Sequence, residues 1–176
     1  MFVSKTIRVA AVLLCVPFSA IAEPAENAPL SIIDSTAPIV AEENLFSRAT
    51  NRIEATVGEA LTLLGVPYRR GGATPEQGFD CSGFVRHVFD SSVGLILPHN
   101  AKAMAAAGDT VDKKSLQPGD LVFFNTMRRT FSHVGIYLGE GFFVHAPRSG
   151  AKVRVEKLDE GYWRKRYNGA RRINQD

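Results

Sequence analysis

A cysteine at the start of a predicted helix is the first residue of the sequence that could do chemistry. From Cys81 to Phe89 the apolar residues recur every three or four positions, which is the spacing of a helix with one buried stripe. Asp80 is a typical N-cap residue and would place Cys81 in the first turn. There the helix dipole and the unpaired N–H groups lower the pKa of a thiol, whereas the Asp80 carboxylate raises it. This stretch alone is compatible both with a nucleophile and with a small buried residue.

Two histidines could supply the base that such a thiol needs. The chain from 133 to 146 indicates a hairpin with its loop over 139–141, where a glycine in the last position provides left-handed backbone. This register sets Gly135 opposite His145 and puts His133 and His145 on one face, whereas a slip of one residue would separate them. One imidazole could then take the thiol proton while the other holds its second nitrogen.

Cys81, His133 and His145 would also suit a zinc ion, which binds cysteine and histidine side chains. The sequence lacks the closely spaced ligand pairs that zinc sites usually show, and its acidic residues do not cluster near these positions. An activated thiol is therefore the better interpretation, and nothing in the sequence points to a metal or to another cofactor.

The first 22 residues have the pattern of a secretory signal peptide. Lys5 and Arg8 precede a short apolar run, and an Ala-Ile-Ala cleavage site ends at Ala22. The run is too short to span a bilayer, and no later stretch is long enough to be a transmembrane segment. Cys15 could be considered for lipid anchoring, but the large Leu14 before it argues against this modification. The sequence therefore predicts an exported protein.

Cleavage after Ala22 would change both the net charge and the number of cysteines of the exported protein. The full chain has a formal net charge of +3, and part of it belongs to the signal peptide. The remainder is close to neutral and lacks the basic footprint of a protein that binds nucleic acid. Cys81 becomes the only cysteine, although exported proteins usually keep cysteines in disulfide pairs. An unpaired thiol in an oxidising compartment favours a chemical role for Cys81.

The exported chain indicates a flexible leader or linker over 23–46 and one domain over 47–176. Prolines among alanine, glutamate and serine predict the linker. Besides the Cys81 helix, the patterns predict helices over 48–64, capped by Ser47, and over 100–107. Besides the hairpin, they predict strands over 121–124 and 152–157, the latter with Val153 and Val155 inward, and a last strand near the C-terminus. Helices followed by an antiparallel sheet predict an α+β domain.

Five motifs occur in an order that identifies a family. They are Gly-Val-Pro-Tyr-x-x-Gly-Gly at 65–72, Asp-Cys-Ser-Gly-Phe at 80–84, Leu-Gln-Pro-Gly-Asp-Leu-Val-Phe-Phe at 116–124, Ser-His-Val-Gly-Ile-Tyr-Leu-Gly at 132–139 and Phe-Val-His-Ala at 143–146. In these motifs the chain resembles the NlpC/P60 family of cell-wall cysteine peptidases over about 47–173. The resemblance implies a reduced papain-like fold, with N-terminal helices packed on an antiparallel β-sheet.

The resemblance also implies catalytic roles for four residues. Cys81 is the nucleophile, His133 is the general base and acid, and His145 orients His133. Tyr68 lies beside the nucleophile, where its hydroxyl helps to stabilise the oxyanion together with N–H groups at the helix start. From the residue alone, Tyr68 could equally be an aromatic cover of the core.

Three further residues match family positions that line the substrate pocket. The resemblance implies that Asp80, Ser82 and Ser132 contact the free amine and the stem-peptide groups of the substrate. From the residues alone, Asp80 and Ser82 are ordinary at a helix start and Ser132 is ordinary in a turn.

The function that the resemblance implies is a periplasmic peptidoglycan hydrolase. It would cut an amide bond in the stem peptide or its cross-link, at D-glutamate or meso-diaminopimelate, without a cofactor. A regulatory protein partner stays open. The alternatives are acyl transfer to an acceptor other than water, a secreted toxin that attacks the walls of competing bacteria, and a non-catalytic wall-binding protein. The presence of both Cys81 and His133 speaks against the last.

Overall fold

The structure, a computed structural model, describes residues 37–126 and 128–174. The predicted signal peptide with Cys15 and the first part of the predicted linker, 23–36, lie outside the described residues. Among the helices that the structure describes, none combines the length and the apolar character needed to cross a membrane.

Helix α1 (Ala37–Thr62) begins earlier than the sequence predicted. Residues 37–46, expected to belong to the linker, are helical. Pro38 lies in the first turn, where a missing N–H breaks no intrahelical hydrogen bond, so this proline does not mark a linker. Ser47 lies inside the helix instead of capping it, and its hydroxyl donates to the Asn44 carbonyl at 3.0 Å.

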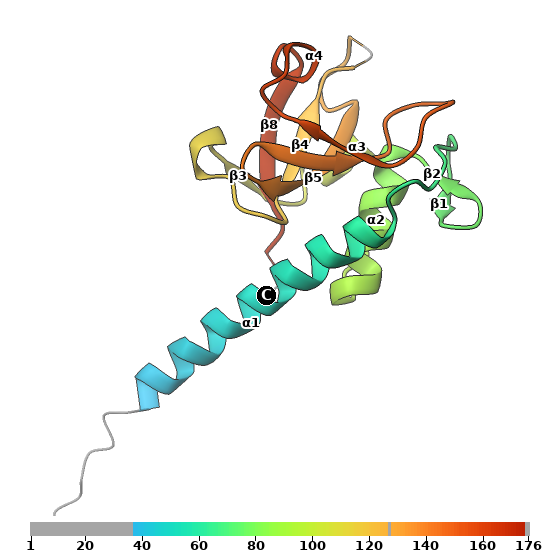
Figure 1. Cartoon of the computed structure of the whole chain (residues 1–176). Helices are drawn as coiled ribbons and strands as arrows, with labels where there is room; N and C mark the ends of the chain where they lie inside the picture. Colours follow the sequence, from blue (N-terminus) through green and yellow to red (C-terminus); the bar gives the residue numbers. More distant parts are fainter. Residues whose placement is uncertain (1–36, 127, 175–176) are drawn as a thin grey trace, which may run out of the picture. The chain divides into compact units, whose positions relative to one another are not determined.

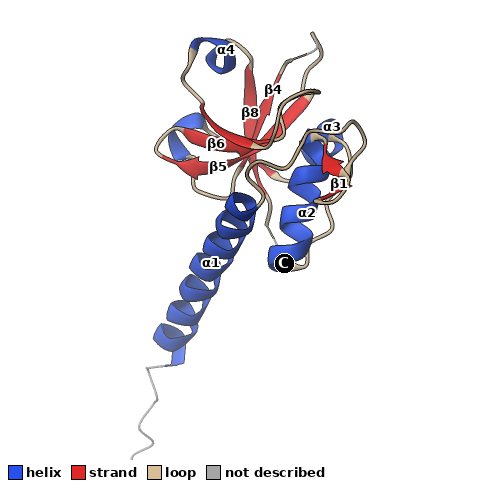
Figure 2. Ribbon diagram, turned by 45° about the vertical axis from the view of Figure 1, so that its right-hand side comes forward, coloured by secondary structure: helices blue, strands red, loops and turns tan. Residues whose placement is uncertain are grey.

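The helix predicted at Cys81 is confirmed as α2 (Cys81–Val93). The Asp80 carboxylate accepts the N–H of Gly83 at 2.7 Å, which is the expected N-cap bond. Gly94 ends the helix in the left-handed region. Helices α1 and α2 pack against each other, and α2 packs against the sheet (Figure 2).

An antiparallel sheet of six strands holds the predicted hairpin (Figure 1). In spatial order the strands are β3 (Asp109–Val111), β8 (Tyr167–Arg172), β4 (Leu121–Phe124), β5 (His133–Gly139), β6 (Phe142–His145) and β7 (Arg154–Lys157). The smaller elements are β1 (Ala73–Thr74), β2 (Gly78–Phe79), α3 (Ala101–Met104), α4 (Gly161–Arg164) and a 3₁₀ turn (Lys113–Ser115). The predicted α+β class is confirmed. The last strand is interior, because β8 lies between β3 and β4.

The predicted register of the hairpin is confirmed along β5 and β6. Ile136 pairs with Val144 and Tyr137 pairs with Phe143. At the loop a bulge places Gly139 opposite Phe142, where Leu138 was expected. The bulge changes the loop end only, so it leaves the faces of the strands as predicted.

Apolar side chains cover both faces of the sheet. Along β4, Leu121 and Phe123 belong to the cluster that includes α1 and α2, whereas Val122 and Phe124 belong to a second cluster with Trp163. On β7 the prediction is half correct. Val153, just before the strand, is buried, but Val155 is 38% exposed because β7 is the edge of the sheet.

Gly83 offers a test of how the loop before β1 is held against α2. A Cβ at Gly83 would lie 2.0 Å from the Gly72 carbonyl oxygen. Gly83→Ala is therefore expected to destabilise the fold by about 2 kcal/mol or more, as overpacking against rigid backbone does. Gly58→Ala is the matched control, because a Cβ there meets nothing within 4 Å, and it is expected to stabilise α1 by about 0.5–1 kcal/mol. Urea unfolding of both variants measures the difference, and equal stabilities would contradict this packing.

Candidate active site

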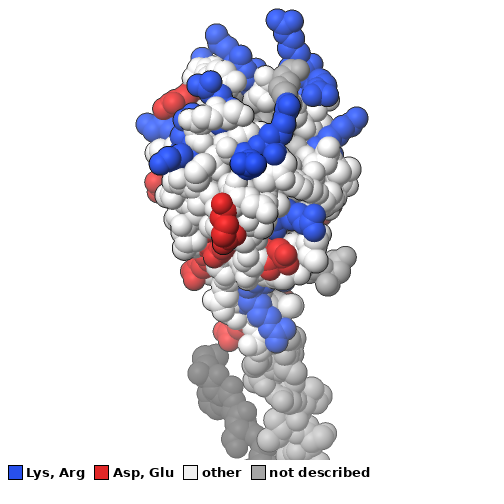
Figure 3. Space-filling model, turned by 90° about the vertical axis from the view of Figure 1, so that its right-hand side faces the viewer, with Lys and Arg blue, Asp and Glu red and all other residues white. Residues whose placement is uncertain are grey.

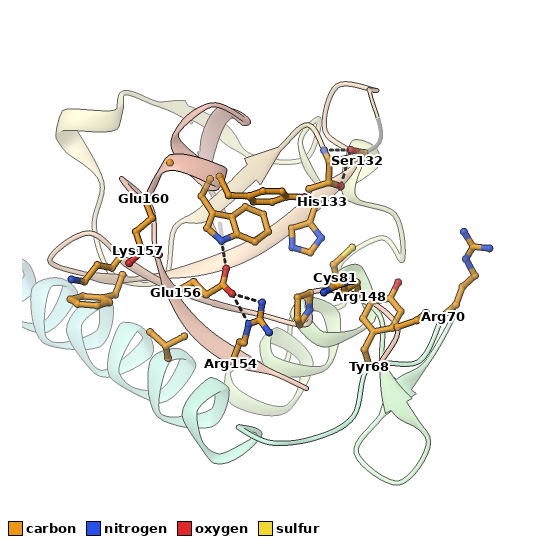
Figure 4. Close-up of a pocket in the computed structure, with 18 residues that line it drawn as sticks. Tyr68, Arg70, Cys81, Ser132, His133, Arg148, Arg154, Glu156, Lys157 and Glu160 are labelled. Carbon is orange, nitrogen blue, oxygen red and sulfur yellow. Dashed lines mark hydrogen bonds and ion pairs between the residues drawn. The ribbon is translucent and has the colours of Figure 1, made fainter. Parts of the chain in front are cut away.

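Cys81 and His133 line the same cavity. Cys81 opens α2 and His133 opens β5, and the cavity between them has a volume of about 1110 Å³. Figure 4 shows the Cys81 sulfur pointing toward the His133 imidazole. The predicted partners, which are distant in the sequence, therefore lie at the start of a helix and at the start of a strand that face the same cavity.

His133 and His145 form a buried hydrogen bond. His133 Nε2 lies 2.7 Å from His145 Nδ1, and the two side chains are almost fully buried. The hairpin register makes this contact possible, as predicted. Gly135 provides the space for the two imidazoles to meet, since a Cβ there would lie 2.8 Å from the Val144 carbonyl oxygen and 3.1 Å from His145 Cβ. His133 Nδ1 is the ring nitrogen left for the thiol.

The structure adds Glu156, which the sequence pattern did not indicate. Strand β7 pairs with β6, and this pairing brings Glu156 Oε2 to 3.5 Å from His145 Nε2. Trp163 Nε1–H donates to Oε2 of the same carboxylate and Arg154 donates to Oε1. The sequence pattern placed Val153 and Val155 inward, and side chains alternate along a strand, so Glu156 was expected to face outward. The signal that could have found it is its place on a strand next to that of His145.

The electrostatics of Cys81 differ from the expectation for a helix start. Burial, together with the smaller effect of the Asp80 carboxylate, raises the pKa of the Cys81 thiol to about 11. The N–H groups of Val134 and Ser82 lower the pKa but do not offset these effects. Burial, with the neighbouring His145, holds the pKa of His133 well below its ordinary value. The resting pair is therefore a neutral thiol beside a neutral imidazole that can accept its proton.

Tyr68 lines the cavity close to Cys81. Burial raises the pKa of Tyr68, and the nearby Cys81 and Asp80 add to this rise. The hydroxyl therefore stays protonated over the ordinary pH range and can donate a hydrogen bond. Its backbone is fixed, because the Tyr68 N–H donates to the Ala151 carbonyl at 2.8 Å.

Two of the three predicted substrate residues hold the start of α2. Asp80 Oδ1 accepts from the Ser82 hydroxyl at 3.0 Å and lies 3.2 Å from His99 Nε2, while Oδ2 accepts the Gly71 N–H at 2.9 Å. Asp80 and Ser82 are not among the side chains that line the cavity, whereas Ser132 is. A substrate role for all three stays a prediction.

Basic side chains outnumber acidic ones around the cavity. Glu156 and Glu160 are its acidic residues, and the basic ones are Arg70, Arg148, Arg154 and Lys157. None of these was singled out from the sequence. Figure 3 shows that Lys and Arg also gather over the upper part of one face of the domain. The cavity therefore suits a substrate that carries carboxylates.

Known proteins share this arrangement of sequence and fold. The profile of the NlpC/P60 family matches residues 65–172. The γ-DL-glutamyl hydrolase of Bacillus subtilis is 45% identical over 119 residues, which cover 67% of this chain and 29% of that protein. The murein DD-endopeptidase MepH of Escherichia coli is 39% identical over 123 residues, 68% of this chain and 45% of MepH. The chain thus spans less than half the length of these two relatives.

Solved structures agree with the sequence comparison. An NlpC/P60 family protein from Bacillus cereus has a TM-score of 0.65 at 33% identity, covering 69% of this chain and 40% of that one. The NlpC/p60 domain of the peptidoglycan hydrolase SagA has a TM-score of 0.61 at 33% identity, covering 69% of this chain and 98% of that domain. These domains have the papain-like fold. With the family profile matched over most of its folded domain, this chain belongs to the NlpC/P60 family.

Proposed function

We propose that the chain is a periplasmic peptidoglycan hydrolase, a cysteine peptidase that cuts amide bonds of stem peptides or of their cross-links. The observation that carries the proposal is the thiol of Cys81 beside the buried His133–His145 pair in an accessible cavity. The similarity to relatives named murein DD-endopeptidase and peptidoglycan hydrolase supports it. The basic lining of the cavity fits stem peptides, which carry free carboxylates.

The first half of the reaction forms an acyl-enzyme. His133 Nδ1 takes the thiol proton as the Cys81 sulfur attacks the carbonyl carbon of the scissile amide. The resulting oxyanion is stabilised by the Tyr68 hydroxyl and by N–H groups at the start of α2. The protonated His133 then gives its proton to the leaving amine, the C–N bond breaks, and a thioester with Cys81 remains.

The second half releases the acid. A water molecule loses a proton to His133 and attacks the thioester carbonyl. The oxyanion uses the same donors, and its collapse breaks the C–S bond. His133 returns the proton to the Cys81 sulfur, which restores the neutral pair. His145 keeps the imidazole of His133 in one orientation through both halves.

Removal of the nucleophile or of the base is expected to abolish hydrolysis. Cys81→Ala and His133→Ala should each lower the rate by about a thousandfold or more, because the two groups act as one unit. Mass spectrometry of murein and muropeptides incubated with the wild type and with each variant measures this loss. The fragment masses of the wild-type digest name the bond. Fragments released equally by a folded Cys81→Ala variant would contradict the proposal.

Tyr68 is expected to act on the oxyanion and not on substrate affinity. Tyr68→Phe keeps the ring and removes the hydroxyl, so kcat should fall about a hundredfold while KM changes little. Steady-state kinetics on a defined muropeptide separate the two constants. A raised KM with unchanged kcat would instead make Tyr68 a residue of substrate binding.

The raised pKa of Cys81 predicts how the free thiol reacts. Since the folded pKa lies near 11, the thiolate fraction at pH 7 is small and grows as the pH rises toward that value. Alkylation of Cys81 by iodoacetamide, followed by intact-protein mass spectrometry, should therefore accelerate steadily between about pH 7 and pH 10. An alkylation rate that already levels off below pH 7 would indicate that Cys81 is a thiolate at neutral pH. This outcome would contradict a neutral thiol beside a neutral imidazole.

A further inference from the structure

We propose that Glu156 is a positioning residue of the active site: its carboxylate fixes the tautomer of His145, and His145 in turn fixes the tautomer of His133. Its catalytic consequence rests on the proposed function. Its structural content, the protonation pattern of two imidazoles, can be measured without any substrate.

The buried edge of His145 is the observation that leads to Glu156. His145 is fully buried, and among the described residues its Nε2 has no formed hydrogen bond. A buried N–H without an acceptor is costly, so such an atom calls for a partner. Glu156 Oε2 lies 3.5 Å away, at the long limit of a hydrogen bond, and its carboxylate is the acceptor that faces this nitrogen.

The tautomers follow from the direction of proton transfer. His133 can accept the thiol proton at Nδ1 only if its own proton is on Nε2. His133 Nε2–H then donates to His145 Nδ1 across 2.7 Å, so Nδ1 of His145 is the acceptor and its proton must be on Nε2. A carboxylate facing His145 Nε2 stabilises this one arrangement. A donor facing Nε2 would stabilise the opposite one and block His133 as a base.

A carboxylate suits this position because donors approach both of its oxygens. Trp163 Nε1–H donates to Oε2 and Arg154 donates to Oε1. A glutamine would have to turn its NH₂ group toward one of these donors. The Trp163 ring also stacks on His133, with centroids 5.5 Å apart and planes 23° apart. Trp163 thus contacts both Glu156 and His133, which lie on either side of His145.

The charges around the imidazoles give the expected sign of a pH effect. Although burial lowers the pKa of His145 and His133, the Glu156 carboxylate raises both. Arg154, on the same strand as Glu156, opposes it at His145. Although burial raises the pKa of Glu156, its contacts with His145, Trp163 and Arg154 lower it to about 2, so the carboxylate is ionised at neutral pH. Cys81, which carries no charge in the resting pair, is the titratable group that approaches from α2.

The kinetic test compares Glu156→Gln with the wild type in the full chain. The variant is expected to lower kcat about tenfold to a hundredfold, with KM nearly unchanged, because the base is misaligned and weaker. The Glu156 charge raises the pKa of both imidazoles, so its loss should lower these pKa values. The acid limb of kcat, which is the fall in kcat as the pH decreases, should therefore move to lower pH. Arg154→Gln removes the opposing charge and should move this limb to higher pH. Glu156→Asp keeps the charge and should recover part of kcat.

Asp159→Asn is the matched control for net charge. Asp159 lies three positions after Glu156, its side chain is 69% exposed, and it pairs with Lys113 at the surface. Its loss should leave kcat and the acid limb unchanged. If Glu156→Gln lowers kcat together with the melting temperature but leaves the acid limb in place, Glu156 is only structural and the proposal fails.

Nitrogen NMR of the histidines separates this inference from the proposed function. In the wild type, we expect His145 to carry its proton on Nε2 with Nδ1 unprotonated, and Glu156→Gln to shift this population toward the other tautomer. Inactivity of the wild type on murein would contradict the hydrolase, and the tautomer shift would still support the role of Glu156. Identical tautomers in the wild type and in Glu156→Gln would overturn that role.

Discussion

The buried hydrogen bond between His133 and His145 is the interaction on which the rest of the site depends. Both imidazoles are nearly inaccessible, so neither can rely on water to satisfy its nitrogens. The bond requires that two residues of neighbouring strands share a face, which a slip of the hairpin by one residue would prevent. It also requires a residue without a side chain at position 135, because a Cβ there would meet the Val144 carbonyl oxygen and His145 Cβ. The loop bulge at Gly139 is tolerated because it lies at the far end from the histidines.

Burial also decides the protonation state of the Cys81 thiol. The helix start alone favours a thiolate at Cys81, but the cost of desolvating a charge outweighs the N–H groups. Asp80 has two opposing effects at this position. Its carboxylate joins Gly71, Ser82 and the first turn of α2, and an N-cap of this kind contributes about 1 kcal/mol to stability. The same charge disfavours a neighbouring thiolate. The fold therefore gains a stable start of α2, while the Cys81 thiol stays protonated at neutral pH.

The parts of the structure that could be predicted from the sequence are those with a strong local signal. The apolar stripe defines α2, and the glycine-flanked loop over 139–141 sets the register of β5 and β6, which puts His133 and His145 on one face. The start of α1 could not be predicted, because a proline fits a linker and a first helical turn equally well. The face on which Glu156 lies could not be predicted either. Because β7 is an edge strand, Val155 is partly exposed, and the alternation of buried and exposed residues along the strand is weak. The pKa of Cys81 depends on burial by segments far away in the sequence.

Two different kinds of structure hold the members of the site in place. His133, His145 and Glu156 come from β5, β6 and β7, which are consecutive neighbours in one hydrogen-bonded sheet. Their spacing is therefore set by backbone ladders. Cys81 belongs to a helix, and its contact with the sheet depends on side-chain packing and on the N–H of Val134. The junction of α2 with β5 is thus where the distance between Cys81 and His133 is decided, and this distance depends on the core residues that pack there.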